Sequence, residues 1–216
     1  MNIIDTRSNI AFSSHKKGNV KNIPLFDLKG IKYSLSSQDF TDIIFQSISS
    51  VEFLKEKEHL IGKNIYAMGP STKNFLSQKG FDSICPDIPG SKELTKLLPK
   101  SESHKFLIVK GADGLSDVFD YLYKNKNKVE EIICYERVKF KSYDNVKEPF
   151  LKADAVIFSS IFGAKIFFEE IYSCDIKAKL FGISDRIINY ISDIGYESKL
   201  IDYFSDNIVK SIKNSI

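Results

Sequence analysis

The sequence predicts an α/β protein made of two similar domains, each with a parallel β-sheet. One observation is that short apolar runs alternate with longer amphipathic stretches, the pattern of strands and helices in βαβ units. The other is a repeat: residues 42–80 resemble residues 155–195. Within it, the interval from Gly69 to Gly80 equals that from Ser184 to Gly195. A repeat of this length indicates two α/β units, and two facing units predict a cleft for a small molecule.

The strands and helices are expected from residue type and periodicity. Most of the short runs are β-branched or aromatic, as buried parallel strands are. The expected strands are 2–5, 22–28, 42–46, 64–68, 106–110, 131–140, 155–159, 179–184 and 197–201. The expected helices are 49–57, 72–79, 91–98, 114–124, 163–172 and 185–193, each with Leu, Ile, Val or Phe on one side.

Two longer extended stretches interrupt this alternation, at 22–33 and 131–143. A chain that leaves one domain, builds a second and returns must cross twice, so these stretches are expected side by side as linker strands. The predicted parts are an outer domain of 1–28 plus 138–216, an inner domain of 29–134, and linker strands near 24–30 and 133–140.

Composition excludes several classes of function. Hydrophobic residues make up 43% of the 216 residues, enough for a packed core. The net charge of +3, from 31 basic and 28 acidic residues, is too balanced to indicate nucleic-acid binding. There is no long apolar run to span a membrane and no apolar stretch of a signal peptide at the N-terminus. A cytoplasmic protein is therefore expected.

Cysteines and histidines give no sign of a metal site. They are Cys85, Cys134 and Cys174, and His15, His59 and His104. The cysteines are odd in number and far apart, so semi-buried thiols are expected rather than a disulfide framework or zinc ligands. The histidines stand in polar, lysine-rich stretches and are expected at the surface, neither ligands nor catalytic bases.

Small, hydroxyl-rich loops follow the predicted strands. They span 46–50, 69–72, 110–114, 159–163 and 184–186. At the carboxyl ends of parallel strands, free N–H groups at helix starts bind carboxylates or phosphates. Ordinary N-capping explains any one loop, but five on matching strand ends favour a ligand site. The sequence has no GxGxxG or GxxxxGK[ST] nucleotide motif and no GxSxG nucleophile motif.

Taken in order, these motifs resemble the uroporphyrinogen-III synthase family across essentially the whole chain. The matching passages are Thr6-Arg7, 44–47 with Val51, 68–72 ending at Gly80, Lys110-Gly111, 135–138, 158–160, and 183–184 ending at Gly195. Four positions or segments depart from the family pattern. The stretch 8–21 is shorter than the family's first helix, Lys110 replaces a common Arg, and Ser184 and Ile187 stand where the family usually has Gly and Thr.

The resemblance implies two flavodoxin-like parallel-sheet α/β domains joined by a two-stranded β linker, with no cofactor. It implies a lyase, a hydro-lyase of tetrapyrrole (haem) biosynthesis. The enzyme would cyclise and dehydrate hydroxymethylbilane to uroporphyrinogen III with inversion of ring D, through an azafulvene and a spiro intermediate. A monomer is expected, with a transient contact to the upstream hydroxymethylbilane synthase and with no nucleic-acid partner and no membrane span.

The resemblance also implies roles for residues. Tyr135 matches a linker-strand tyrosine whose phenol could donate a hydrogen bond to the leaving hydroxyl, and Thr72 is the second catalytic candidate. Tyr33 and Tyr143 are expected to be structural. The predicted substrate-binding residues are Thr6, Arg7, Gln46, Ser47, Gly69, Ser71, Lys110, Gly111, Ser159, Ser160 and Ser184.

The main alternative is a non-catalytic two-lobed module that binds a small anion or regulates. The lack of a signal peptide argues against a periplasmic binding protein. A receiver domain is disfavoured because Asp5 stands alone after the first strand, without the acidic pocket such domains use.

Overall fold

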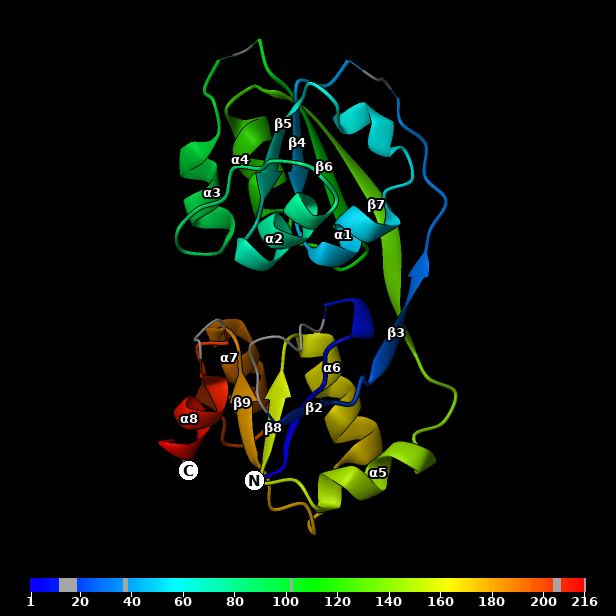
Figure 1. Ribbon diagram of the computed structural model, residues 1–216, viewed down its shortest axis with the longest axis vertical. Helices are drawn as coiled ribbons and strands as arrows, with labels where there is room; N and C mark the ends of the chain where they lie inside the picture. The colour runs from blue at the N-terminus through cyan, green and yellow to red at the C-terminus, as the bar shows by residue number, and fades with distance from the viewer. Residues whose placement is uncertain (12–18, 37–38, 102, 204–206, 216) are drawn as a thin grey trace. The chain divides into compact units, whose positions relative to one another are not determined.

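A computed structural model describes residues 1–11, 19–36, 39–101, 103–203 and 207–215. The chain divides into two compact units (Figure 1). The outer unit comprises Met1–Asp27 and Val138–Ile216, and the inner unit comprises Leu28–Arg137. Each unit contains one five-stranded sheet, so the predicted pair of parallel-sheet α/β units is confirmed.

The inner sheet has the strand order β3-β7-β6-β4-β5. Its strands are β3 (Phe26–Gly30), β4 (Asp42–Phe45), β5 (Asn64–Ala67), β6 (Lys105–Gly111) and β7 (Lys128–Lys139). β4 pairs in parallel with β5 and β6, and β6 pairs in parallel with β7. A single bridge between Tyr66 and Ile84 extends the β5 edge.

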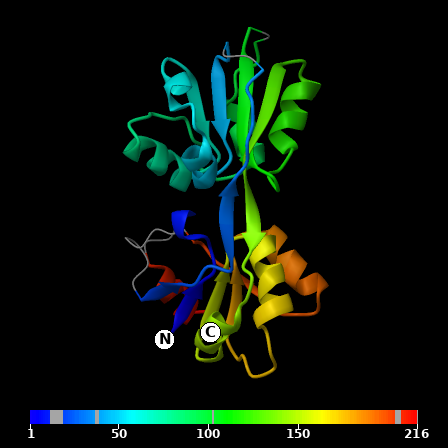
Figure 2. The same cartoon turned by 90° about the vertical axis from the view of Figure 1, so that its right-hand side faces the viewer.

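Helices cover both faces of the inner sheet (Figure 2). They are α1 (Ile48–Phe53), η3 (Lys57–Leu60), α2 (Pro70–Gln78), α3 (Ser91–Leu97) and α4 (Asp117–Lys124). On one face, Val51 of α1 and Leu76 of α2 pack against Phe45. On the other, Leu94 of α3 and Leu122 of α4 pack with Ile44. Adjacent residues of β4 thus point to opposite cores, as the pleat of a strand requires.

The outer sheet has the order β10-β9-β8-β1-β2. Its strands are β1 (Ile3–Asp5), β2 (Val20–Asn22), β8 (Ala155–Phe158), β9 (Lys179–Gly182) and β10 (Lys199–Leu200), all paired in parallel. The helical segments are η1 (Asn9–Ala11), α5 (Asp144–Leu151), α6 (Ile161–Ile166), the π-helical η4 (Phe167–Ile171), α7 (Asp185–Asp193) and α8 (Ile208–Lys213). Ile208 and Ile212 of α8 pack against Ile157 on one face, while Phe167 of η4 contacts Phe158.

The two sheets have the same arrangement when the repeat is superposed. β4 lies between β5 and β6, as β8 lies between β9 and β1. The pairing registers agree: Ile44 pairs with Ile108 where Ile157 pairs with Asp5. Numbered along the chain, the strands of the outer unit lie in the flavodoxin-like order 2-1-3-4-5. In the inner unit β4 to β7 follow the same order 2-1-3-4, and β3 takes the fifth place. The predicted repeat is therefore real.

Two glycines explain why the repeat keeps its spacing. Gly80 follows α2 and Gly195 follows α7, and each has φ of +86°. Helices commonly end with a residue in this left-handed region, which glycine adopts without steric cost. The next residue closes the same turn in both copies: Phe81 N–H bonds to Leu76 O, and Tyr196 N–H to Ile191 O.

Some sequence expectations about single elements are wrong. The expected strand 22–28 is two strands, β2 and β3, because Pro24 between them has no N–H to donate. Helix α5 was not predicted, since Pro149 inside it breaks the helical pattern, yet buried Phe150 anchors it. Helix α8 was also missed. Of the stretch 8–21, residues 12–18, with His15, lie outside the described residues.

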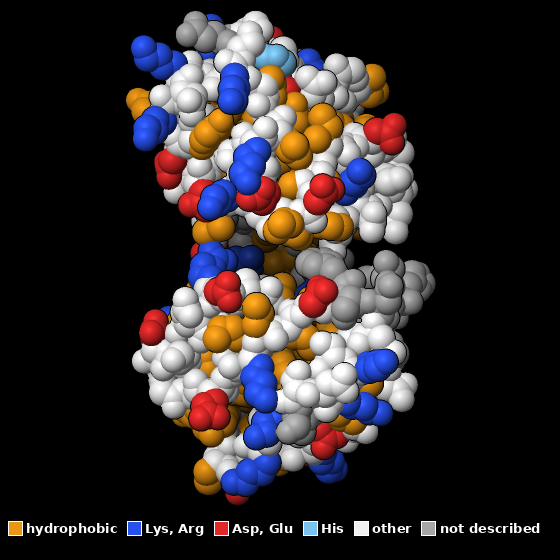
Figure 3. Space-filling view, turned by 90° about the vertical axis from the view of Figure 1, so that its left-hand side faces the viewer, with side chains coloured by type: hydrophobic (Ala, Val, Ile, Leu, Met, Phe, Trp, Pro, Cys, Tyr) orange, Lys and Arg blue, Asp and Glu red, His pale blue; other side chains and the backbone are white. Residues whose placement is uncertain are grey.

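The surface carries both signs of charge. Lys and Arg side chains alternate with Asp and Glu over the face drawn in Figure 3. In the part of the chain that the structure describes, no helix combines the length and apolar character needed to cross a bilayer.

Candidate functional site

The inner unit gathers most of the predicted site at one edge of its sheet. Parallel pairing puts the carboxyl ends of β4, β5 and β6 at the same edge. The predicted residues that follow these strands are Gln46 and Ser47, Gly69 and Ser71, and Lys110 and Gly111. This edge is where open α/β sheets bind ligands.

Tyr135 of β7 lies at this edge and is 4% exposed. Its hydroxyl is 3.0 Å from Ser47 Oγ, and its ring stacks on Phe53 with centroids 5.6 Å apart. It pairs in register with Gly111, and a Cβ on Gly111 would lie 2.5 Å from Tyr135 Cζ. Gly111 is thus required by the close approach of the ring. Sequence reasoning did not identify Phe53 as a site residue, because it placed this residue only on the apolar face of a predicted helix.

Ser47 caps helix α1 as well as contacting Tyr135. Its Oγ accepts the Ser50 N–H at 3.0 Å, and Ser50 Oγ accepts the Ser47 N–H at 3.1 Å. This reciprocal capping box fixes the backbone at the end of β4. The serine is therefore both an ordinary N-cap and a partner of the phenol.

Helix α2 begins at the same edge. Gly69 is its N-cap and Pro70 its first residue, where a missing N–H costs nothing. Thr72 lies in the first turn and is buried. Within the described part of the chain, the Thr72 hydroxyl makes no hydrogen bond. A hydroxyl and a partly positive helix start suit an anionic ligand.

Gln46 and Lys110 are both held by protein partners. Gln46 Nε2 donates to Leu115 O at 2.8 Å and so fixes the loop after β6. Lys110 is buried, and its Nζ donates to Glu131 Oε1 at 2.7 Å. The cation at the end of β6 is therefore neutralised by a carboxylate on the neighbouring strand.

The outer unit presents the remaining predicted residues at the carboxyl edge of its own sheet. Thr6 and Arg7 follow β1, Ser159 and Ser160 follow β8, and Ser184 follows β9. Thr6 Oγ1 donates to Ile157 O at 2.9 Å. Ser160 caps α6 by accepting the Gly163 N–H at 3.1 Å, whereas Ser184, the N-cap of α7, makes no such bond. Thr6 and Ser160 thus have structural hydrogen bonds already.

Asp5, the single acidic residue expected at the end of the first strand, is held by a basic and an aromatic partner. Asp5 is 0% exposed, and its carboxylate accepts from the Tyr203 hydroxyl at 2.7 Å and from Arg7 Nε at 3.1 Å. The Arg7 guanidinium also lies 3.5 Å from the Tyr203 ring centroid. Burial lowers the pKa of Arg7, and Asp5 opposes that shift. Sequence reasoning missed Tyr203 because a partner so distant in the chain leaves no local pattern.

His104 is not merely a surface residue. Its Nδ1 lies 2.5 Å from Oδ2 of Asp42, a carboxylate fully shielded from solvent that also accepts from Asn64 Nδ2 at 3.0 Å. Burial, followed by this carboxylate, raises the pKa of Tyr66 to about 12. The group lies at the amino ends of the inner strands, the edge opposite Tyr135.

The other tyrosines and cysteines agree only in part with expectation. Tyr143 donates to Leu25 O at 2.9 Å and Tyr33 donates to Glu56, contacts that agree with the structural roles expected for both. Cys85 is partly buried as expected, but Cys134 is buried and Cys174 exposed. Burial raises the pKa of the Cys134 thiol to about 12.

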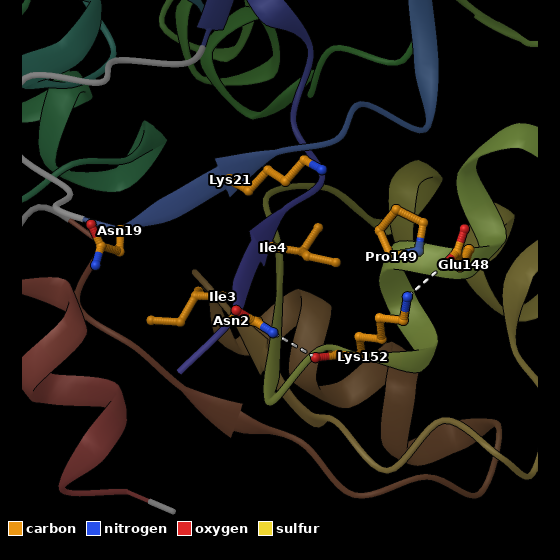
Figure 4. A pocket seen from close by; sticks show the side chains of 8 residues that line it. All are labelled: Asn2, Ile3, Ile4, Asn19, Lys21, Glu148, Pro149 and Lys152. Atoms are coloured by element: carbon orange, nitrogen blue, oxygen red, sulfur yellow. Dashed lines mark hydrogen bonds and ion pairs between the residues drawn. The ribbon is translucent and has the colours of Figure 1, made fainter.

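A cavity of about 350 Å³ lies away from these edges, in the outer unit (Figure 4). Its lining includes Asn2, just before β1, and Lys21 of β2, together with Glu148 and Lys152 of the α5 region. Glu148 pairs with Lys152 at 2.5 Å. Glu148 and Lys152 thus neutralise each other, and no predicted site residue is among the lining residues. Among the described residues, no cluster of three or more His, Cys, Asp or Glu could hold a metal ion.

Comparison with known proteins points to one family. The family model for uroporphyrinogen-III synthase HemD matches residues 19–202. The solved uroporphyrinogen-III synthetase of Helicobacter pylori 26695 is similar, with a TM-score of 0.72 at 18% identity over 99% of this chain and 97% of that one. A mutant uroporphyrinogen III synthase of the extremely thermophilic bacterium Thermus thermophilus gives a TM-score of 0.55 at 12% identity over 99% and 96%. No curated protein matches significantly. At such identities the structures show a shared fold.

Proposed function

The chain belongs to the uroporphyrinogen-III synthase family, and from this premise we propose how its residues close hydroxymethylbilane to uroporphyrinogen III in haem biosynthesis. The reaction removes water by breaking a C–O bond without hydrolysis, so the enzyme is proposed to be a hydro-lyase. The substrate is a linear tetrapyrrole with many carboxylates. Its pyrroles are electron-rich and ionise readily, so the protein must chiefly shape the chain and assist the leaving hydroxyl.

Tyr135 is the proposed donor to that hydroxyl. The observation that carries this proposal is its phenol at the carboxyl edge of the inner sheet, held 3.0 Å from Ser47 Oγ. As the C–O bond breaks, the bonding pair leaves with oxygen, which takes the phenol's proton and departs as water. The carbon left behind is stabilised by its pyrrole nitrogen. The proton is recovered when the new C–C bond forms and the attacking pyrrole loses one to regain aromaticity.

Thr72 and the strand-end loops are proposed to bind the substrate's carboxylates. Thr72 offers a hydroxyl without another partner among the described residues, and the first turn of α2 offers backbone N–H groups. Gly69 and Ser71 lie at the same helix start. Thr6, Arg7, Gln46, Lys110, Gly111, Ser159, Ser160 and Ser184 remain proposed substrate-binding residues, whereas Ser47 is hydrogen-bonded to the phenol of Tyr135.

Three further proposals concern the setting. The substrate closes spontaneously to the type I isomer, so direct supply by a transiently bound hydroxymethylbilane synthase would limit that loss. We propose that the enzyme acts as a monomer and in the cytoplasm. Sedimentation of the purified chain at assay concentration tests the monomeric state, and a sedimentation coefficient of a dimer would contradict it.

The decisive experiment supplies purified protein with hydroxymethylbilane made freshly by its upstream enzyme. The products are oxidised and the type I and type III porphyrin isomers are separated. The expected result is predominantly type III, while a heat-denatured control gives type I. Type I alone from folded protein would overturn the proposed function and favour a non-catalytic anion-binding module.

A further inference from the structure

The hydroxyl of Tyr135 is the end of a short series of hydrogen bonds at the start of α1. Ser50 N–H donates to Ser47 Oγ at 3.0 Å, and Ser47 Oγ lies 3.0 Å from Tyr135 Oη. A serine hydroxyl has one proton and two lone pairs. The Ser50 N–H occupies one lone pair of Ser47 Oγ. The hydroxyl proton of Ser47 and its second lone pair are therefore available to Tyr135.

The polarity of the Ser47–Tyr135 bond decides what Tyr135 can do. If the phenol donates to Ser47, its only proton is directed away from a substrate. If Ser47 donates to the phenol oxygen, the phenol proton is free for the leaving hydroxyl. The second arrangement runs in one direction, from Ser50 N–H through Ser47 and Tyr135 to the substrate, and each bond then polarises the next. Only the phenol proton of Tyr135 is transferred to the leaving hydroxyl, because the Ser50 amide donates a hydrogen bond without losing its proton.

The residues packed around the Tyr135 ring hold its hydroxyl next to Ser47. Its ring stacks on Phe53 at an interplanar angle of 24°, and Gly111 lies so close that a Cβ would be 2.7 Å from Cε2. The capping box holds Ser47 from the other side, because Ser50 Oγ also donates to Ser47 O at 2.6 Å. Both hydroxyls are thus fixed in place, and only their protons can rotate.

The outer unit shows that an N-cap serine does not by itself imply this arrangement. Ser160 caps α6 in the same way, through the Gly163 N–H at 3.1 Å. The aromatic residue beside that helix start is Phe26, whose ring meets Phe162 with centroids 5.4 Å apart and has no hydroxyl. The serine–phenol bond is a feature that the inner unit adds to a shared capping motif.

We propose that Ser47 is a positioning residue for Tyr135: it donates its hydroxyl proton to the phenol oxygen and leaves the phenol proton for the leaving hydroxyl. This inference rests on the proposed function. It gives Ser47 a role through Tyr135 rather than through contact with substrate. It therefore affects turnover and leaves substrate binding nearly unchanged.

A double-mutant cycle tests the proposal. Ser47→Ala, Tyr135→Phe and the double variant are assayed for type III product at varied hydroxymethylbilane concentration. Ser47→Ala is expected to lower kcat about fivefold to twentyfold with KM changed less than about twofold. This loss is smaller than the roughly 10²- to 10⁴-fold that a general acid contributes, because the phenol of Tyr135 is still present. In the Tyr135→Phe background the same change is expected to cause no further loss of kcat. Ser47→Thr keeps the hydroxyl and should retain most activity.

The matched control is Asn207→Ala. Asn207 caps α8 by accepting the Lys210 N–H at 2.9 Å, far in sequence from the site. It should lower the thermal midpoint about as much as Ser47→Ala while leaving kcat unchanged. If Ser47→Ala does not fold, Ser47→Asp replaces it, because a carboxylate keeps the cap but only accepts. Its kcat should fall with Tyr135 present and not in the Tyr135→Phe background.

Each outcome is decisive. Equal fractional losses of kcat in both backgrounds, or a loss confined to KM, would overturn the positioning role. A fully active Tyr135→Phe variant would overturn it too, because Ser47 would have nothing to position. Failure of the proposed function is distinct: the wild-type chain itself would then give only type I product.

Discussion

The inner and outer units share a sheet but differ in the chemistry at its carboxyl edge. The registers match Lys110 with Arg7 and Glu131 with Asn22. Counting four residues on from the last pair reaches Tyr135 in the inner unit and Phe26 in the outer unit. β2 ends at Asn22 and Phe26 belongs to β3, so this last match is one of residue count. Phe26 does lie beside the start of α6, as Tyr135 lies beside the start of α1. The two strand ends share a backbone arrangement, whereas the hydroxyl that is proposed to react, that of Tyr135, belongs to the inner unit.

The two buried cations sharpen this contrast. Lys110 and Arg7 occupy matched positions, and each is neutralised by a carboxylate, but the carboxylates come from different places. Glu131 stands on the adjacent strand and is partly exposed, whereas Asp5 stands two residues before Arg7 and is fully buried. The outer pair is therefore part of the core, and the inner pair borders solvent.

The largest expected effect comes from breaking these pairs. Asp5→Asn removes a fully buried carboxylate from Arg7 and should lower the free energy of unfolding by about 3 kcal/mol. Glu131→Gln removes the inner carboxylate at a partly exposed position and should cost about 1 kcal/mol. Urea denaturation followed by circular dichroism measures both. Equal losses would show that the two cations are equally part of the core.

The next prediction concerns the glycine beneath the phenol. Gly111→Ala places a methyl group 2.5 Å from Tyr135 Cζ, so the ring must move, at a cost of about 2 kcal/mol and with most of the turnover lost. The control is Gly163→Ala in the outer unit, where the nearest atom would be 3.4 Å away and stability should change by less than about 0.5 kcal/mol. Similar behaviour of the two variants would contradict the tight approach inferred for Gly111.

Exchange of the matched aromatics tests where the chemistry lies. Tyr135→Phe should lower type III turnover at least about tenfold, equivalent to about 1.4 kcal/mol of transition-state stabilisation, with an unchanged circular dichroism spectrum. Phe26→Tyr added to this variant should not restore turnover, because the proposed donor belongs to the inner edge. Restoration by Phe26→Tyr, or near-normal activity of Tyr135→Phe, would remove the proposed asymmetry.

The smallest effect should be equal in the two units. Gly80→Ala and Gly195→Ala each force a side chain into a backbone with φ of +86°, where the Cβ meets no other atom within 4 Å. The cost is then conformational alone, about 1 kcal/mol for each variant. Thermal melts of the two proteins should agree within about 0.5 kcal/mol. A larger difference would mean that the two helix ends contribute differently to stability despite their shared backbone geometry.

Sequence reasoning located the elements that depend on local pattern. Ser47 and Ser160 were placed at helix starts, and Gly80 and Gly195 at matched intervals, because capping and turns are short-range. It could not find partners that tertiary packing supplies. The Ser47–Tyr135 bond spans 88 positions and the Asp5–Tyr203 bond spans 198. The hydrogen bond between His104 and Asp42 was missed for the same reason, because Asp42 is distant in the chain.

The split of the outer sheet along the chain has a consequence during synthesis. Every strand of the inner sheet, from β3 to β7, has been made by residue 139. β1, by contrast, lies between β2 and β8, so the pairing of Ile3 with Ala155 can form only after β8 has been synthesised. Domains fold as units while the ribosome proceeds from the N-terminus. The inner unit can therefore complete its sheet on the nascent chain, while the first strand of the protein waits for one of the later ones.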